Sequence, residues 1–283
     1  MPYRLVQAPA AEPLSLLDAK LHLRVDVADD DALIAALITS TRLYAESYLR
    51  RCLVSQSWKL VIDSFPGPTM IGIPWGKPFT LPAHAIILEK SPVQAISAIN
   101  YTAMDGTVQT MPPADYVVDD TSEPCRITPV FGQIWPIPLP QIGAVELGFV
   151  SGYAAPVAFA APGTMAVQGA WRAYAVGDAV QLSNTGGAVP AELQAQANYW
   201  IESVVAPGVY TLSSASGGAP IGFADAGTGT SFVGVIPEGI KSWMKIRMTS
   251  MYEYRGDVVI PERGKMEPLP YVDRLLDPYR VVF

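Results

Sequence analysis

The residues DDDALIAALITSTRLYAESYLRRC, numbered 29–52, form a long and regular helical pattern. Their apolar side chains recur at the i, i+3, i+4, i+7 spacing of an amphipathic helix. Asp29 or Asp30 can cap the free N–H groups at its start, and Arg50 and Arg51 suit the negative end of the helix dipole. The expected apolar face consists of Leu33, Ile34, Leu37, Ile38, Tyr44, Ala45, Tyr48, Leu49 and Cys52. Such a helix must bury that face against a partner.

The partner is predicted near the other end of the chain, after Ile236. Pro237 suits the first position of a helix, and apolar residues follow at helical spacing. A shorter helix is predicted in LSLLDAKLHLRV, 14–25, where Ser15 and Asp18 have the spacing of a capping box with Ser15 as the N-cap. The expected helical core comprises Leu33, Leu37, Tyr44, Tyr48, Ile240, Trp243, Met244 and Met251.

Between these helices the sequence favours strands. Residues 1–13 contain three prolines and read as an extended arm, and residues 55–153 hold short alternating segments broken by Gly and Pro, including one at Met70–Ile73. The Asp105–Gly106 pair, with alternating residues on both sides, predicts a β-hairpin. We therefore expect an antiparallel sheet region that follows the N-terminal helices.

Residues 154–235 differ in composition, with only five charged side chains, no lysine and twelve of the 23 glycines. Their strand patterns and long loops favour a small all-β module, such as a sandwich, inserted in a parent domain made of residues 1–153 and 236–283. The segment AAPVAFAAPG, 154–163, is the expected linker. The predicted class is α+β: a helical bundle, an antiparallel sheet region and an inserted all-β domain.

The composition excludes several classes of protein. Half of the 283 residues are hydrophobic and 16% are charged, so a disordered chain is not expected. The net charge of −7 disfavours a protein that reads nucleic-acid sequence. Cys52 and Cys125 are too few for a disulfide framework and are expected to be reduced. The sequence shows no signal-peptide pattern and no apolar run of membrane length, so a soluble, non-secreted protein is expected.

Candidate catalytic residues are scarce. His22 and His84 are the only histidines, and neither has a second ligand at metal-binding spacing. Asp119–Asp120 and Asp29–Asp31 are explained by a strand-end turn and a helix cap. No nucleophile, phosphate-binding or zinc motif occurs. We expect no enzyme activity, no metal and no cofactor.

The last segment, from about residue 257, is a proline-punctuated tail. It carries Leu269, Tyr271, Leu275, Leu276, Tyr279, Val281 and Phe283. A tail this apolar is seldom left in water, so it is expected to dock on its own chain or on another one.

Five segments in a fixed order resemble one family. They are LSLLDAKLHLRVD (14–26), DDALIAALITSTRLYAESYLRR (30–51), SWKLVIDSFPG (57–67), IPEGIKSWMKIRMTSMYEYRGD (236–257) and LLDPYRV (275–281). As an ordered set they resemble the head–tail connector, or adaptor, proteins of tailed bacteriophages. Residues 154–235 depart from the compact members of that family, and they resemble small β modules of other phage structural proteins.

The resemblance implies a structural subunit of a dodecameric ring in the neck of the virion, assembled in the host cytoplasm. The ring would dock under the portal protein, extend the DNA channel and carry the stopper or tail proteins. DNA would only pass through it, and no membrane is involved. The β module would face capsid or fibre proteins. The tail would dock on the portal through Leu269, Tyr271, Leu275, Leu276, Tyr279, Arg280, Val281 and Phe283.

An alternative function is a tail-associated protein that binds a receptor or carbohydrate through the β module. Trp171, Tyr174, Tyr199 and Trp200 could stack on sugar rings, although core packing also explains aromatic residues on strands. An enzyme of β-sandwich type is a third reading, but no set of residues supports it.

Overall fold

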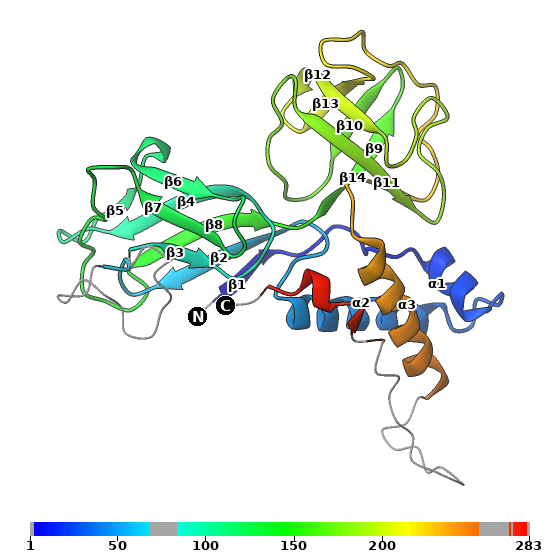
Figure 1. Cartoon of the computed structure of the whole chain (residues 1–283), viewed down its shortest axis with the longest axis horizontal. Coiled ribbons are helices and arrows are strands. Elements are labelled where there is room, and N and C mark those ends of the chain that lie inside the picture. Colours follow the sequence, from blue (N-terminus) through cyan, green and yellow to red (C-terminus); the bar gives the residue numbers. More distant parts are fainter. Residues whose placement is uncertain (1–2, 68–83, 255–271, 273, 282–283) are drawn as a thin grey trace.

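The computed structural model describes residues 3–67, 84–254, 272 and 274–281. Figure 1 shows three parts: a region of two packed sheets, a separate barrel, and a layer of helices below the barrel. Both ends of the chain contribute to the helical layer, and all the strand pairing is antiparallel. The predicted α+β class, with an additional all-β region, is confirmed.

The helical layer consists of α1 (Leu16–Leu23), α2 (Asp31–Leu49) and α3 (Glu238–Glu253). Its core is made of Leu14, Ala19, Ile34, Ile38, Ala45, Leu49, Leu53, Ile240, Trp243, Met244, Met248, Val272 and Leu276. The predicted pairing of the long N-terminal helix with the C-terminal helix is therefore present. Trp243 is fully buried at its centre, where its ring stacks on Tyr44 at 5.5 Å.

The buried face of α2 is rotated relative to the expected one. Leu33, Leu37 and Tyr48 are only partly buried, whereas Tyr44 is 50% exposed and covers Trp243 with one face of its ring. Met251 is 39% exposed, because it lies in the last turn of α3, beyond the reach of the buried side chains. Residues with polar side chains, Thr41, Arg42 and Glu46, are buried instead.

The predicted N-cap of α1 is confirmed, but the carboxylates expected at the two helix starts make other contacts. Ser15 does cap α1, accepting a 3.0 Å hydrogen bond from Asp18 N–H, but the Asp18 carboxylate does not return to Ser15 N–H. Asp30 occupies the N-cap position of α2 without a capping hydrogen bond from its side chain. Its carboxylate instead accepts a hydrogen bond from Tyr252 Oη on α3. Both carboxylates bind distant parts of the chain rather than the local backbone.

The sheet region has two layers. One is a five-stranded sheet of order β1-β2-β8-β4-β5, and the other is a three-stranded sheet of order β3-β7-β6. The first uses β1 (Tyr3–Gln7), β2 (Gln56–Ile62), β4 (Val93–Thr102), β5 (Val108–Thr110) and β8 (Val145–Ser151). The second uses β3 (Ile86–Leu88), β6 (Tyr116–Asp119), which follows the 3₁₀ turn Pro113–Asp115, and β7 (Cys125–Pro129).

Two local predictions for this region can be compared with the structure. The hairpin at Asp105–Gly106 joins β4 to β5, and Gly106 has the positive φ of 84° that such a turn requires. The expected N-terminal arm is extended, as predicted, but residues 3–7 form an edge strand on β2. The strand predicted at Met70–Ile73 lies outside the described residues.

Residues 154–234 form a closed six-stranded barrel of order β10-β13-β12-β11-β14-β9 rather than a sandwich. The strands are β9 (Ala154–Ala160), β10 (Thr164–Val167), β11 (Ala179–Thr185), β12 (Asn198–Ala206), β13 (Val209–Ser213) and β14 (Thr230–Gly234). The segment expected to be a linker is thus strand β9, paired with both β10 and β14. Its small apolar residues are buried between neighbouring strands, so the barrel begins directly after Tyr153.

The described part of the tail lies against the helical layer. Val272 and Leu276 are buried in the helical core, and Leu275 and Tyr279 pack on it. Val281 N–H donates to the carbonyl oxygen of Leu49 at 3.2 Å, satisfying a group at the end of α2. The tail therefore has an internal partner, which the sequence did not reveal. Leu269, Tyr271 and Phe283 lie outside the described residues.

We expect Leu276→Ala to lower the free energy of unfolding by about 2–5 kcal/mol, because it leaves a cavity in the helical core. Leu276 is 1% exposed. Leu43→Ala, at a side chain of α2 that is 55% exposed, is the matched control and should have little effect. Chemical denaturation measures both changes. Equal small losses would show that the tail does not belong to the core.

Candidate functional site: the contacts and surfaces of the helical layer

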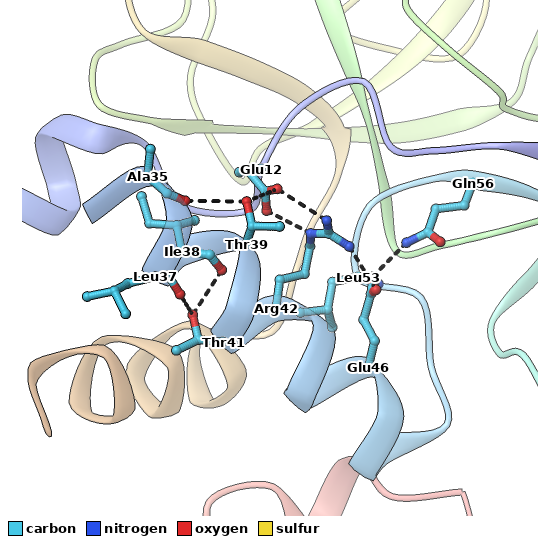
Figure 2. Close-up of polar contacts among 10 residues, drawn as sticks. All are labelled: Glu12, Ala35, Leu37, Ile38, Thr39, Thr41, Arg42, Glu46, Leu53 and Gln56. Atoms are coloured by element: carbon cyan, nitrogen blue, oxygen red, sulfur yellow. Dashed lines mark hydrogen bonds and ion pairs between the residues drawn. The ribbon is translucent and has the colours of Figure 1, made fainter. Parts of the chain in front are cut away.

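A buried ion network joins α2 to the N-terminal arm and to β2 (Figure 2). Arg42 donates from Nε to Glu12 Oε2 at 2.7 Å and from Nη1 to Glu46 Oε2 at 2.9 Å. Glu46 Oε1 accepts from Leu53 N–H at 2.9 Å and from Gln56 Nε2 at 2.7 Å. Each carboxylate oxygen of Glu46 therefore has a donor, which is the condition for burying a charge.

Burial prevails at Glu46 but not at Arg42. It raises the pKa of Glu46, and the charge of Arg42 and the hydrogen bond from Leu53 oppose that shift. Burial alone would lower the pKa of Arg42, but the hydrogen bond to Glu12 and the charges of Glu46 and Glu12 more than offset it. Arg42 therefore stays charged, and the stability of Glu46 as a carboxylate depends on it.

A second arginine connects the helical layer to the sheets and the tail. Arg51, which follows α2, is 7% exposed and forms a two-pronged ion pair with Glu123, in the loop between β6 and β7. Its Nε donates to the carbonyl oxygen of Tyr279. Its guanidinium also lies 5.5 Å from the ring centre of Tyr153, just before the barrel. One side chain thus holds four segments together.

The barrel is seated on the start of α1. The carboxylate of Asp18 accepts from Thr185 Oγ1 and, at 2.9 Å, from Gly186 N–H, while Ser15 N–H donates to Thr185 Oγ1 at 2.9 Å. Gly186 has φ of +74°, and a Cβ there would lie 2.4 Å from Ser15 Oγ. A small apolar cluster of Val54, Ala154, Phe232 and Ile236 fills the adjacent junction. The barrel is therefore fixed by contacts on two sides.

A groove of about 340 Å³ lies between α2 and α3. Tyr44 and Arg247 stand on its two sides, with the Arg247 guanidinium 5.7 Å from the centre of the Tyr44 ring. Ser250, Met251 and Tyr254 complete the α3 side and are exposed. Tyr44 and Met251, which were expected in the helical core, line this groove instead. Thr41, which was not expected to be buried, lines it as well.

Three of the four aromatic residues of the alternative hypothesis belong to the barrel core or pack against it, and the fourth, Trp200 on β12, is partly buried. Tyr174 and Tyr199 are each 6% exposed and belong to the barrel core, and Trp171 packs against that core. Trp171 Nε1 donates to Tyr174 Oη, and Arg172 stacks on the Tyr174 ring at 4.8 Å. Burial raises the pKa of Tyr174 to about 12. These rings stabilise the barrel instead of presenting their faces to a ligand.

The remaining candidate residues have structural partners or isolated positions. Asp119 accepts hydrogen bonds from Arg126, Ser122 and Thr121, and these hold its pKa well below the usual range. Cys52 and Cys125 are free thiols, and burial raises the pKa of each to about 12. Within the described ranges, no cluster of three or more His, Cys, Asp or Glu residues could hold a metal ion. No described helix is long and apolar enough to span a membrane.

Sequence reasoning missed Asp18, Arg42, Glu46 and Arg51 as long-range contacts. Arg42 and Glu46 have the i, i+4 spacing of an exposed ion pair, and that pattern alone does not indicate burial. A signal was available in the period of α2, because Ile34, Ile38, Ala45 and Leu49 define a face whose edge passes through both residues. Glu12, Gln56 and Thr185, which complete the contacts, are too far away in sequence to be recognised.

Comparisons with known proteins agree with the resemblance seen in the sequence. Residues 13–108 match the family model described as Phage gp6-like head-tail connector protein. A chain of the solved "Virion of native gene transfer agent (GTA) particle" aligns at 14% identity with a TM-score of 0.52. A chain of the "Neck of empty GTA particle computed with C6 symmetry" aligns at 16% identity with a TM-score of 0.54. Both alignments cover 100% of this chain and 97% of the other.

No curated protein matches the chain significantly. The family match confirms the resemblance to head–tail connectors over the matched residues. The two solved structures show a shared fold, and their alignments include the barrel.

We expect Arg42→Met to lower the free energy of unfolding by about 3–5 kcal/mol at pH 8, because it leaves the buried Glu46 without its cation. Since the folded-state pKa of Glu46 is raised, protonation at lower pH favours the folded state, and the loss should shrink towards pH 5. Denaturation at several pH values measures this. Lys59→Met, which breaks a pair that is 34% and 41% exposed, is the control. A loss that grows on acidification would contradict the assignment.

Gly186→Ala tests the seating of the barrel, with Gly217→Ala as its control. Both glycines have φ near +70°, so both variants bear a strain of about 1–2 kcal/mol. Only at position 186 does the new Cβ meet another element, because nothing lies within 4 Å at position 217. We expect Gly186→Ala alone to speed amide hydrogen exchange at Ser15 and Asp18. Equal exchange in the two variants would rule out the contact.

Proposed function

We propose that this chain, whose residues 13–108 carry the phage head–tail connector family match, is a structural subunit of a head–tail connector ring. The observation that carries the proposal is the family match over α1, α2 and strands β2 to β4, together with the helical layer that α1 and α2 form with α3. The proposed location is the neck of a virion, after assembly in the host cytoplasm. In this role the protein has no enzymatic activity and needs no cofactor.

The ring we propose has twelve copies and sits beneath the portal protein. Cyclic assembly requires each subunit to offer two different surfaces, one to each neighbour. The similar neck of the empty GTA particle was computed with C6 symmetry, which a twelve-membered ring also contains. DNA would pass through the channel without base-specific contacts, and the net charge of −7 suits a wall that does not retain it.

The portal, the stopper or tail proteins, and capsid or fibre proteins are the proposed partners. The barrel stands away from the two sheets in Figure 1 and is fixed to α1, so it is the part we assign to capsid or fibre contacts. The tail is the part we assign to the portal. Leu275, Leu276, Tyr279 and Val281 pack on the helical layer or are buried, so among the described members of the expected docking set Arg280 is the exposed one.

The function is tested by native mass spectrometry and electron microscopy of the purified chain, alone and mixed with the portal protein of its own particle. We expect a closed ring seated on the portal and a mass that corresponds to one ring per portal. A chain that remains monomeric and does not bind the portal would overturn the proposal.

The role of the tail is tested in the same mixture with Arg280→Glu. Because this residue is exposed, the substitution should leave the fold intact, although it removes the contact between the guanidinium and the Tyr48 ring, whose centre is 5.1 Å away. We expect weaker portal binding and a melting temperature that falls only slightly. Lys59→Glu, on β2 of the five-stranded sheet, is the matched charge-reversal control. Unchanged portal binding by Arg280→Glu would show that the docking surface lies elsewhere.

A further inference from the structure

We infer that the corner between α1 and α2 of one copy occupies the α2–α3 groove of the next copy. The corner is defined here by Leu21, Asp26, Val27 and Asp29, and the groove by Tyr44, Arg247, Ser250, Met251 and Tyr254. This contact rests on the proposed ring and deepens it, because it names the two surfaces through which copies associate.

The corner is apolar, acidic and held in one conformation. Leu21 is 77% exposed and Val27 is 60% exposed, and Asp26 and Asp29 beside them are exposed as well. Lys20 Nζ donates to the carbonyl oxygen of Val27 at 2.8 Å and pairs with Asp31 at 2.6 Å. Lys20 therefore bridges the turn from both sides. A preorganised protrusion loses little conformational freedom when it binds.

The groove has the complementary shape and charge. It is a cavity of about 340 Å³ whose walls include two tyrosine rings and the Met251 side chain. Arg247 stands on its side as the cation, and among the described residues no carboxylate pairs with it. Asp26 and Asp29 likewise have no cationic partner in the described part of the chain. An acidic, apolar corner and a basic, apolar groove satisfy each other.

The two surfaces lie on opposite flanks of α3. Lys245 is near His22 of α1, and burial and the charge of Lys245 together lower the pKa of His22. Tyr252 on the same side of α3 reaches Asp30 at the start of α2. Arg247, Ser250 and Tyr254 are two positions away from these residues, which is about 200° around a helix. One copy can therefore contact two neighbours at once.

A contact between two different surfaces is heterologous, and it closes into a ring when the rotation between copies permits. The exposed Leu21 and Val27 side chains would bury apolar surface against the Tyr44 ring and Met251 in the groove. A second copy is therefore the occupant we assign to the groove.

Disulfide trapping tests the contact directly. In a chain carrying both Val27→Cys and Ser250→Cys, oxidation should join copies into a ladder of multimers that ends at the ring. Each single variant can give only dimers, and a mixture of the two single variants should give mainly the mixed dimer. The native cysteines do not interfere, because both are 1% exposed. Rings that form without a 27–250 bond would overturn this interface and leave the ring proposal standing, whereas persistent monomers would overturn both.

Charge reversal supplies an independent measurement. Arg247→Glu should weaken self-association by about fivefold, and adding Asp26→Lys in the same chain should restore it, because every interface then has the pair reversed. Analytical ultracentrifugation measures the dissociation constants. A second measurement tests whether the groove is filled by the chain's own residues instead of a second copy. It is the rate at which a maleimide modifies the cysteine of Ser250→Cys in the dilute monomer. Fast modification that slows on assembly supports the inference, and slow modification at every concentration would mean that the chain's own residues fill the groove.

Discussion

The packing of α2 against α3 is the constraint on which the rest of this structure depends. The two helices come from opposite ends of the chain, and Trp243 reaches into a core built from both. The segment between them, which forms the barrel and every strand of the two sheets except β1, must therefore leave and return to the same place. The chain leaves the helical layer through Leu53 and Val54 and returns to it through Ile236. Leu53 is buried in the core of the helical layer, and Val54 and Ile236 are buried together in the small junction cluster. A single helix pair thus fixes both junctions.

Polar contacts then give the three parts a defined arrangement. Glu46 draws the start of β2 towards α2, Arg51 ties the three-stranded sheet and the tail to the end of α2, and Asp18 seats the barrel on α1. The side chains of Arg42, Glu46 and Arg51 are each less than 10% exposed. Buried charges tolerate few geometries, because a lost partner leaves a desolvated ion. Hydrophobic burial drives the association, and these contacts select one arrangement.

The sequence predicted the helices, the hairpin and the all-β region, because each depends on a local period or turn. It predicted only part of the buried side of α2: Ile34, Ile38, Ala45 and Leu49 are buried as expected, whereas the burial of Thr41, Arg42 and Glu46 was not expected. Tyr44 and Met251 fit the apolar period, but both remain exposed. Tertiary packing, which the period does not describe, determines which positions of a helix are covered. The sequence predicted a linker at residues 154–163 because Ala and Pro are uncommon in strands, whereas pairing with β10 and β14 makes Ala154–Ala160 strand β9. The sequence also did not show that the tail packs on its own chain. Val281 bonds to Leu49 at the end of α2, which is more than 200 residues away in sequence.

The proposed ring depends on how the two contact surfaces are held relative to each other. In a closed ring, an angular error at one interface accumulates at every following copy, so each subunit must hold its two contact surfaces at a fixed angle. The α1–α2 corner and the α2–α3 groove share α2, and Lys20 and Tyr252 brace that helix from α1 and α3. The angle between the two surfaces is thus defined within one helical layer. The sheets and the barrel are attached to that layer through separate residues, so their outer loops can differ without changing the geometry of a ring built by the helices.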